Sequence, residues 1–169
     1  MLQAHQIRGL PILDVETGKE LGTCKDILIS KEFKAAGMLI DAKRWLSAPR
    51  MIRMDALLSI GDDAVMLPNA DVIQPWKEEL HGDWLCSQHF KGLPVYTSNG
   101  HQLGTIEDVY FSKDSDKDIV GLELTDGFLS DIQEGRSWLP IQTPMRIGED
   151  AVIVSSVSEQ DVKKIVTNQ

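Results

Sequence analysis

Apolar residues along this chain fall in short segments that Gly, Pro, Asn and Asp interrupt at close spacing, as in residues 92–112, GLPVYTSNGHQLGTIEDVYFS. Short runs rich in Ile, Val and Leu and bounded by turn residues indicate β-strands rather than helices. Residues 9–30, GLPILDVETGKELGTCKDILIS, carry the same pattern. With a single gap, the two stretches share Gly, Leu and Pro, and then Gly, Leu, Gly, Thr, Asp and Ser. The pattern predicts a strand-rich unit that occurs twice.

The similarity between the two units continues downstream. IGDDAV at 60–65 returns as IGEDAV at 147–152, and GMLI at 37–40 parallels GLEL at 121–124. WLS at 45–47 likewise parallels FLS at 128–130. The offset between the copies drifts slightly, as expected for small insertions in loops. We therefore place repeat one at residues 1–72, a linker at 73–84, and repeat two at 85–169.

Each repeat is expected to fold into a small closed barrel. The dipeptide Asn99-Gly100 is the strongest hairpin signal in the chain and predicts a tight turn of the primed type, with Gly100 at positive φ. In repeat one the corresponding turn is one residue longer and places Gly18 at the matching position. Closing several short strands into a barrel would remove exposed sheet edges. The predicted fold class is thus all-β in the main, with two tandem small β-barrels.

The linker is more apolar than a solvated connection would be. Residues 74–82 are long enough for one or two helical turns ending at Gly82. The segment carries Trp76 and Leu80, and Trp84 follows directly. Side chains of this kind are expected to be packed, so the two barrels should touch.

A second short helix is expected at the C-terminal end of the chain. Ser158 is a suitable N-cap, and Asp161 lies three residues further on. Val162, Ile165 and Val166 are spaced to form one apolar face. These features predict a short helix after the last strand of repeat two.

The motif Leu-Gly-Thr-x-x-Asp followed by three apolar residues and Ser, and the later Ile-Gly-[Asp/Glu]-Asp-Ala-Val, resemble the PRC-barrel family. The resemblance covers both repeats. The chain as a whole resembles small bacterial proteins made of two tandem PRC-barrels. It implies compact β-barrels that act as adaptors for other proteins, with no shared catalytic residues. The family also includes a domain of the photosynthetic reaction centre and one of a ribosome maturation factor, but the chain lacks their additional segments.

The charge and composition of the chain limit the classes of partner that it is expected to bind. The formal net charge is −9, which disfavours direct nucleic-acid binding because phosphate contacts need a basic surface. No apolar run reaches the roughly 18 residues of a transmembrane segment, and the first residues lack a signal-peptide pattern. Cys24 and Cys86 lie far apart in unrelated contexts, which favours free thiols over a disulfide. A cytoplasmic location is expected.

The sequence carries no catalytic, cofactor-binding or metal-binding motif. Asp114, Asp116 and Asp118 have the opening spacing of a calcium loop, but Ile119 stands where the loop needs Gly and Thr125 where it needs Glu. The four histidines have no ligand spacing with one another or with the cysteines. A phosphate-binding glycine loop is absent. A small-molecule site inside a barrel of this size is disfavoured, since side chains fill small barrels.

Asp26 and Asp108 form the one polar pair retained within an otherwise apolar strand. They could be a shared site acid, or they could accept backbone N–H bonds and fix a bulge or turn. The two repeats have unlike loops and would not both need the same active-site acid. The structural interpretation is therefore favoured.

Aromatic residues in matched loops are the first candidates for partner binding. Trp45 and Leu46 in repeat one correspond to Phe128 and Leu129 in repeat two, next to charged or glycine turns. Exposed aromatics on loops suit a protein contact, although the same residues could plug the end of each barrel.

The groove beside Trp76 and Trp84 is the second candidate. The leading hypothesis is a non-enzymatic adaptor that binds another protein. The alternative is a factor that acts in ribosome or RNA maturation through a protein partner.

Overall fold

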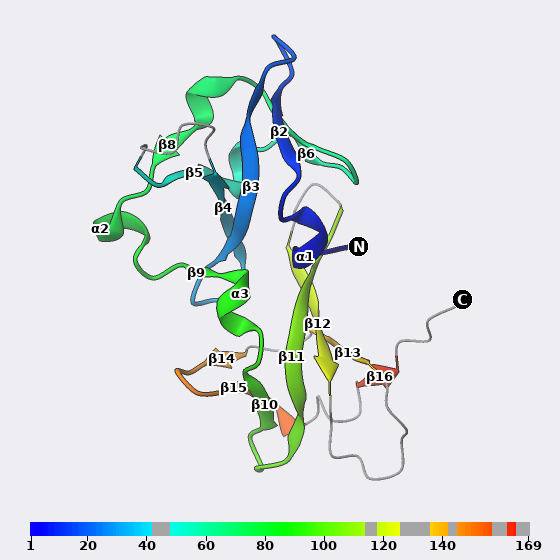
Figure 1. Cartoon of the computed structure of the whole chain (residues 1–169). Coiled ribbons are helices and arrows are strands. Elements are labelled where there is room, and N and C mark those ends of the chain that lie inside the picture. Colours follow the sequence, from blue (N-terminus) through cyan, green and yellow to red (C-terminus); the bar gives the residue numbers. More distant parts are fainter. Residues whose placement is uncertain (42–47, 114–117, 126–135, 142–144, 157–161, 165–169) are drawn as a thin grey trace.

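The computed structural model describes residues 1–169 except 42–47, 114–117, 126–135, 142–144, 157–161 and 165–169. The described residues form two sheets, one built mainly from each repeat, with single-turn helices between them (Figure 1). Both sheets have the same strand order, so the repeat in the sequence is a repeat of structure.

The sheet of repeat one follows the order β6-β7-β2-β3-β4-β5-β8, with β9 paired to β3 off this path. Its strands are β2 (Pro11–Asp14), β3 (Glu20–Ile29), β4 (Ala35–Asp41), β5 (Arg50–Arg53), β6 (Ser59–Ile60), β7 (Val65–Leu67), β8 (Gln74–Pro75) and β9 (Leu85–Cys86). Short 3-10 turns, η1 (Met54–Ala56) and η2 (Ala70–Val72), join the later strands.

The sheet of repeat two follows the order β14-β15-β10-β11-β12-β13-β16, with β1 paired to β11 off this path. Its strands are β1 (Leu2–Gln3), β10 (Pro94–Thr97), β11 (Gln102–Phe111), β12 (Ile119–Thr125), β13 (Ser137–Pro140), β14 (Arg146–Ile147), β15 (Val152–Val154) and β16 (Lys163–Lys164). Among the described residues, neither sheet has a pairing between its first and last strand. The mainly β fold with two tandem units is confirmed.

The two repeats exchange their N-terminal segments. β1 pairs with β11 of repeat two, while β9, at the start of repeat two, pairs with β3 of repeat one. The helices that follow, α1 (Ala4–Ile7) and α3 (Ser87–Phe90), each contact both β3 and β11. Figure 1 shows both helices between the two sheets. Each sheet therefore contains a strand from the other repeat.

The paired aspartates hold the exchanged helices in place. Asp108 Oδ2 accepts the backbone N–H of His5 in α1 at 3.2 Å, and Asp26 Oδ2 accepts that of Gln88 in α3 at 3.2 Å. The Oδ1 atom of each aspartate accepts the next N–H of its own strand at 2.8 Å. The register of β3 and β11 shifts at both positions. The structural interpretation is confirmed, and these bulges also cap helices from the opposite repeat.

One hydrophobic core runs through both repeats. Ile7 and Phe90, from the exchanged helices, are completely buried in it. Phe90 packs edge to face against Phe33 of the β3–β4 turn, with ring centroids 5.4 Å apart. Phe33 sits at φ 58°, where a non-glycine residue is uncommon, so this contact helps to hold an unfavourable backbone. The two repeats therefore share one packed unit, as the apolar linker suggested.

The β10–β11 hairpin differs from the predicted turn. Gly100 has φ +88°, as expected, but Asn99 does not have positive φ, so the turn is not of the primed type. Gly100 N–H donates to Thr97 O at 2.9 Å, and Thr97 N–H donates to His101 O at 2.8 Å. This is a longer loop whose last residue is left-handed, a geometry that also matches strand twist. Gly18 occupies the same place in repeat one, at φ +66°.

Gly100→Val should lower the free energy of unfolding by about 1–3 kcal/mol, because a β-branched residue is strained at positive φ. A Cβ there would meet no atom within 4 Å, so the loss would come from the backbone alone. Urea denaturation followed by circular dichroism measures the change. Ser98→Val, two positions earlier in the same turn, is the control and should leave the midpoint nearly unchanged. An equal midpoint for Gly100→Val and the native protein would contradict the turn geometry.

Of the two helices predicted from the sequence, the structure confirms the one in the linker but not the one near the C-terminus. The linker forms α2 (Glu78–His81), which ends at Gly82 as expected. The expected C-terminal helix is wrong where the structure describes it, since Lys163–Lys164 forms strand β16 against β13. Ser158, Asp161, Ile165 and Val166 lie outside the described residues. A short isolated helix has little intrinsic stability, whereas pairing satisfies backbone groups along the edge of β13. β8 does the same for β5 in repeat one.

Candidate functional site

The linker forms a rigid aromatic projection on the sheet of repeat one. Trp76 N–H donates to Pro49 O at 2.8 Å, which fixes the start of the projection to the chain before β5. His81 lies between two tryptophans, with ring centroids 5.2 Å from Trp76 and 4.9 Å from Trp84. It is only 6% exposed, and its Nδ1 accepts the Lys77 N–H at 3.3 Å. A histidine in this position supports the turn rather than binding a ligand.

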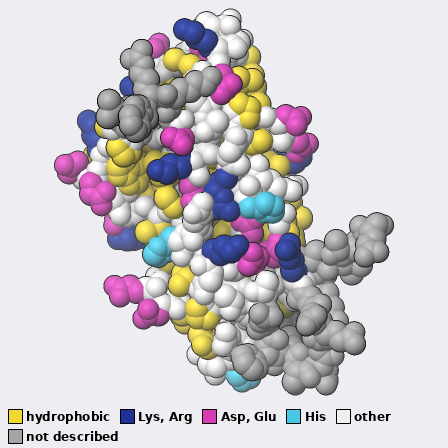
Figure 2. Space-filling view, in the orientation of Figure 1, with side chains coloured by type: hydrophobic (Ala, Val, Ile, Leu, Met, Phe, Trp, Pro, Cys, Tyr) yellow, Lys and Arg dark blue, Asp and Glu magenta, His cyan; other side chains and the backbone are white. Residues whose placement is uncertain are grey.

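Leu80 lies in α2, within this projection. It is 69% exposed, the largest exposed fraction among the described large hydrophobic residues. Glu78, Glu79 and Asp83 are exposed around it. Figure 2 shows acidic side chains beside hydrophobic ones where α2 projects, on the left of this face. We call Trp76, Leu80 and Trp84 the linker projection.

The six candidate partner-binding residues divide into two groups. Trp45, Leu46, Phe128 and Leu129 lie outside the described residues. Trp76 and Trp84 lie within the described part and are half-buried, packed around His81. The structure therefore brings together one of the two predicted surfaces and adds Leu80 to it.

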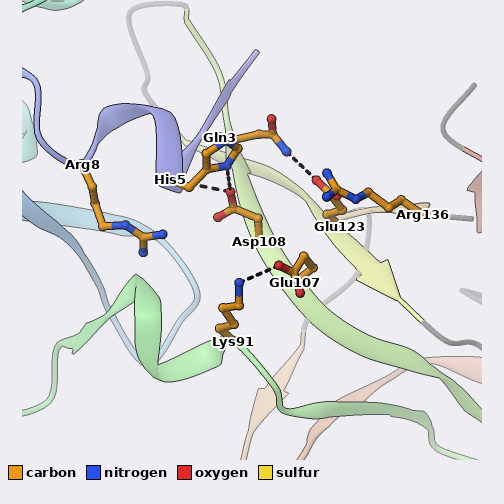
Figure 3. A pocket seen from close by; sticks show the side chains of 8 residues that line it. All are labelled: Gln3, His5, Arg8, Lys91, Glu107, Asp108, Glu123 and Arg136. Atoms are coloured by element: carbon orange, nitrogen blue, oxygen red, sulfur yellow. Dashed lines mark hydrogen bonds and ion pairs between the residues drawn. The ribbon is translucent and has the colours of Figure 1, made fainter. Parts of the chain in front are cut away.

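A second feature is a polar pocket of about 250 Å³ at the junction of the two repeats. Basic, acidic and histidine side chains gather at the middle of the face in Figure 2, over this junction. Figure 3 shows the side chains that line the pocket, which come from both repeats: Gln3, His5, Arg8, Lys91, Glu107, Asp108, Glu123 and Arg136. The first three belong to or follow the exchanged segment β1–α1. The pocket therefore exists only when that segment is docked.

Glu123 is a charged side chain placed inside the protein. It lies on β12 and is only 1% exposed. Its Oε2 accepts hydrogen bonds from Gln3 Nε2 and, at 3.0 Å, from Tyr110 Oη. Burial and the neighbouring Glu123 raise the pKa of Tyr110 to about 12, so the phenol stays protonated and donates. Two donors thus stabilise one oxygen of the carboxylate.

The second oxygen of Glu123 is less well satisfied. Arg136 Nη1 lies 2.9 Å from Oε1 as an ion pair, but no hydrogen bond with suitable geometry reaches this oxygen among the described residues. Arg136 is 62% exposed and approaches from the solvent side. A buried acceptor without a hydrogen bond is costly and usually has a functional or ligand-related cause.

Of the other charged side chains in the pocket, some are fully paired, whereas Arg8 has N–H donors left over. Lys91 Nζ lies 2.6 Å from Glu107 Oε1, and His5 Nδ1 lies 2.5 Å from Asp108 Oδ2. Arg8 makes a 3.4 Å hydrogen bond to Ser87 Oγ and approaches Asp26 at 3.9 Å. A guanidinium has five N–H donors, so Arg8 retains donors for a further acceptor.

The comparison with known families agrees with this architecture. A family model described as PRC-barrel domain matches residues 1–73 and again residues 88–161. The chain belongs to the PRC-barrel family. A search of curated proteins gives no match. In this PRC-barrel protein the first matched region includes repeat one and the second covers most of repeat two, and the exchanged segment β1–α1 lies within the first match.

Metal and membrane features are limited in the described part of this PRC-barrel protein. No group of three or more His, Cys, Asp or Glu side chains there could hold a metal ion. Of the calcium-like loop, Asp114 and Asp116 lie outside the described residues. No described helix has the length and apolar character to cross a membrane. Cys24 and Cys86 are free thiols, and burial raises the pKa of Cys24 to about 12.

The pocket was missed by sequence reasoning, although a signal for it was present. Glu123 is the odd residue in the parallel between GMLI at 37–40 and GLEL at 121–124, where repeat one has Leu39. When one repeat has a charged residue at a strand position that is apolar in the other repeat, the fold alone does not account for the charge. The partners of Glu123 could not be found this way, because Gln3 reaches it from the other repeat.

Proposed function

We propose that this PRC-barrel protein is a non-enzymatic adaptor that binds a protein partner through the linker projection. The observation that carries the proposal is Leu80, which is exposed in the short helix α2 beside the stack of Trp76, His81 and Trp84. A large apolar side chain on a rigid support loses little entropy on binding, which favours affinity. Aromatic residues next to such a side chain are typical of interface hot spots.

The surroundings of the linker projection indicate the character of the partner. Exposed Glu78 and Glu79 precede Leu80 in the chain, and exposed Asp83 follows it. Lys77 is the positive charge next to them in the sequence, and Lys31 forms an ion pair with Asp83 at 2.5 Å. Complementary charge at the rim of an interface speeds association and selects partners. The expected partner surface is an apolar socket with a basic rim. A ribosomal protein would fit this description, so an action in ribosome maturation through a protein partner stays as the second hypothesis.

Leu80→Asp should weaken partner binding by about 2 kcal/mol or more, because a carboxylate would be buried in the partner's apolar socket. The native and variant proteins are compared in affinity capture from the source cells with mass spectrometry. Binding of each captured partner is then measured with purified components. Thermal unfolding of the variant should be unchanged, since the side chain is exposed in the free protein.

Leu58→Asp is the matched control, because Leu58 is also exposed, at 53%, but lies away from the linker projection before β6. Partners lost by the Leu80 variant and kept by the Leu58 variant would support the proposal. Partners that bind both variants equally would exclude the linker projection. Reproducible capture of ribosomal proteins alone would select the second hypothesis for the biological process.

A further inference from the structure

Each sheet has an outer face, the one turned away from the shared core. Side chains alternate between the two faces along a strand. Ile27 in β3 belongs to the core, so the next residue, Leu28, lies on the outer face. Met51 in β5 lies there for the same reason, since its neighbour Ile52 belongs to the core.

In repeat one the linker covers this outer face. β8 pairs with β5 and β9 pairs with β3, so the linker between β8 and β9 crosses from one side of the β3–β4–β5 sheet to the other. Leu28 and Met51 are completely buried although they point away from the core. Their burial indicates that the linker crosses the outer face.

The matching face of repeat two is partly exposed. Strand pairing gives Tyr110 the position that Leu28 has in repeat one. In the same way, Trp138 has the position of Met51. Both aromatic side chains are half-buried, whereas their counterparts are completely buried. Repeat two therefore exposes part of a surface that repeat one covers.

Tyr110 and Trp138 form a rigid aromatic surface. Their rings are stacked, with centroids 5.3 Å apart and 25° between the planes. Trp138 lies directly over Gly121, because a Cβ there would come within 2.9 Å of the indole. The Tyr110 hydroxyl donates to Glu123 at 3.0 Å, which holds the second ring. Aromatic side chains held in this way lose little conformational entropy when a partner covers them.

The edge of this aromatic surface is basic, in a chain whose formal net charge is −9. Arg136 is 62% exposed and immediately precedes β13. β16 places Lys163 and Lys164 along β13, beside Trp138. The two residues of β8, which take the place of β16 in repeat one, carry no charge. We call the following set the repeat-two platform: Tyr110, Trp138, Arg136, Lys163 and Lys164.

The repeat-two platform is complementary to the linker projection. It has the apolar surface and the basic rim that are expected of the partner. The linker projection offers the exposed Leu80 beside the exposed carboxylates of Glu78 and Glu79. Two copies of an acidic chain repel each other over most of their surfaces, so opposite charges at these two places select this contact.

We propose that the linker projection of one copy binds the repeat-two platform of a second copy of this chain. Leu80 packs on the two aromatic rings, while Glu78 and Glu79 face the basic edge. Figure 1 shows α2 and β16 on opposite sides of the molecule, so each contact leaves one projection and one platform free. Such a head-to-tail contact builds rings or open chains rather than a two-fold dimer. The inference rests on the linker projection being an interaction surface, as proposed above.

The test uses the purified intact chain with no other protein present. Sedimentation velocity from micromolar to millimolar concentration should show a mass that rises beyond that of a dimer. Leu80→Asp should weaken the association by roughly ten-fold or more, as for other interface anchors. Leu58→Asp is the control, because Leu58 is also exposed but lies outside both surfaces. A chain that stays monomeric or stops at a dimer would overturn the proposal, as would equal association of the two variants.

Charge reversal identifies the two surfaces. One variant carries Glu78→Lys and Glu79→Lys, and the other carries Lys163→Glu and Lys164→Glu. Each variant alone brings like charges together and should associate roughly ten-fold more weakly or less than the native chain. An equimolar mixture should associate again, because the basic projection of the first variant meets the acidic platform of the second. A mixture of folded variants that stays monomeric would contradict the proposal.

Trp138→Ala tests the aromatic surface and should also weaken the association. Unchanged association would contradict the assignment of the platform. Circular dichroism checks that the variant is folded, and the mixture of charge-reversed variants decides the question if it is not.

The same measurements separate this inference from the adaptor proposal. Purified protein that stays monomeric, together with partners captured through Leu80, would reject self-association and keep the adaptor. Self-association that depends on Leu80, together with capture of other proteins that does not, would keep this inference and reject the adaptor.

Discussion

Residues 1–82 and residues 83–169, expressed separately, should each be far less stable than the intact PRC-barrel protein. Separation removes β1 and α1 from the sheet of repeat two, and β9 and α3 from the sheet of repeat one. Exposing a fully buried large apolar side chain costs about 1.5–3 kcal/mol, and both Ile7 and Phe90 would be affected. The combined loss is comparable to the total stability of a small domain.

Urea denaturation of each half, followed by circular dichroism, measures this loss against the intact chain. The two halves should also restore each other when mixed, because each carries the segment that the other lacks. Light scattering would then show a one-to-one complex, with a midpoint closer to that of the intact protein. Two halves that are individually as stable as the whole chain, and that do not associate, would contradict the exchanged arrangement.

Phe90→Ala should reduce the free energy of unfolding by about 3–5 kcal/mol, the usual cost of removing a buried phenylalanine. The side chain is completely buried and lies between the two sheets, where it packs against Phe33. Because α3 contacts both β3 and β11, both repeats should unfold earlier and in a single transition. The midpoint and the slope of urea denaturation measure the effect.

Leu58→Ala provides the control, since this leucine is exposed and should cost less than about 0.5 kcal/mol. A double-mutant cycle with Phe33→Leu and Phe90→Leu isolates the ring contact, which should contribute about 0.5–1.5 kcal/mol beyond area burial. A loss confined to one repeat, seen as a separate early transition, would mean that Phe90 does not join the two sheets.

The strands and the repeat could be predicted because their signals are local. Alternation, turn residues and the doubled motif specify β3 and β11 with their matching bulges at Asp26 and Asp108. The exchange could not be predicted, because the pattern of Leu2–Gln3 suits pairing with β3 of its own repeat as well as with β11. The choice depends on contacts between residues far apart in the sequence, such as the hydrogen bond from the His5 N–H to Asp108. At 163–164, sheet pairing outweighed a weak helical pattern.

The candidate sites show the same division between local and distant information. The apolar linker predicted that Trp76 and Trp84 would be packed, and both are half-buried against His81. The junction pocket needs Gln3, Tyr110 and Glu123 together, three residues that no sequence spacing connects. The only sign of the pocket in the sequence is Glu123, a charged residue in a strand that is apolar in the other repeat.

The reciprocal exchange has a consequence for how such a protein can diverge. Two identical chains exchanging the same segments would form a symmetric dimer with two copies of every junction, and any substitution would change both at once. Joining the two units in one chain removes that constraint. The junction with Leu39 and Cys86 can keep the more apolar form that stability favours. The junction with Glu123 is then free to accumulate polar groups at the expense of packing, because its counterpart continues to secure the assembly.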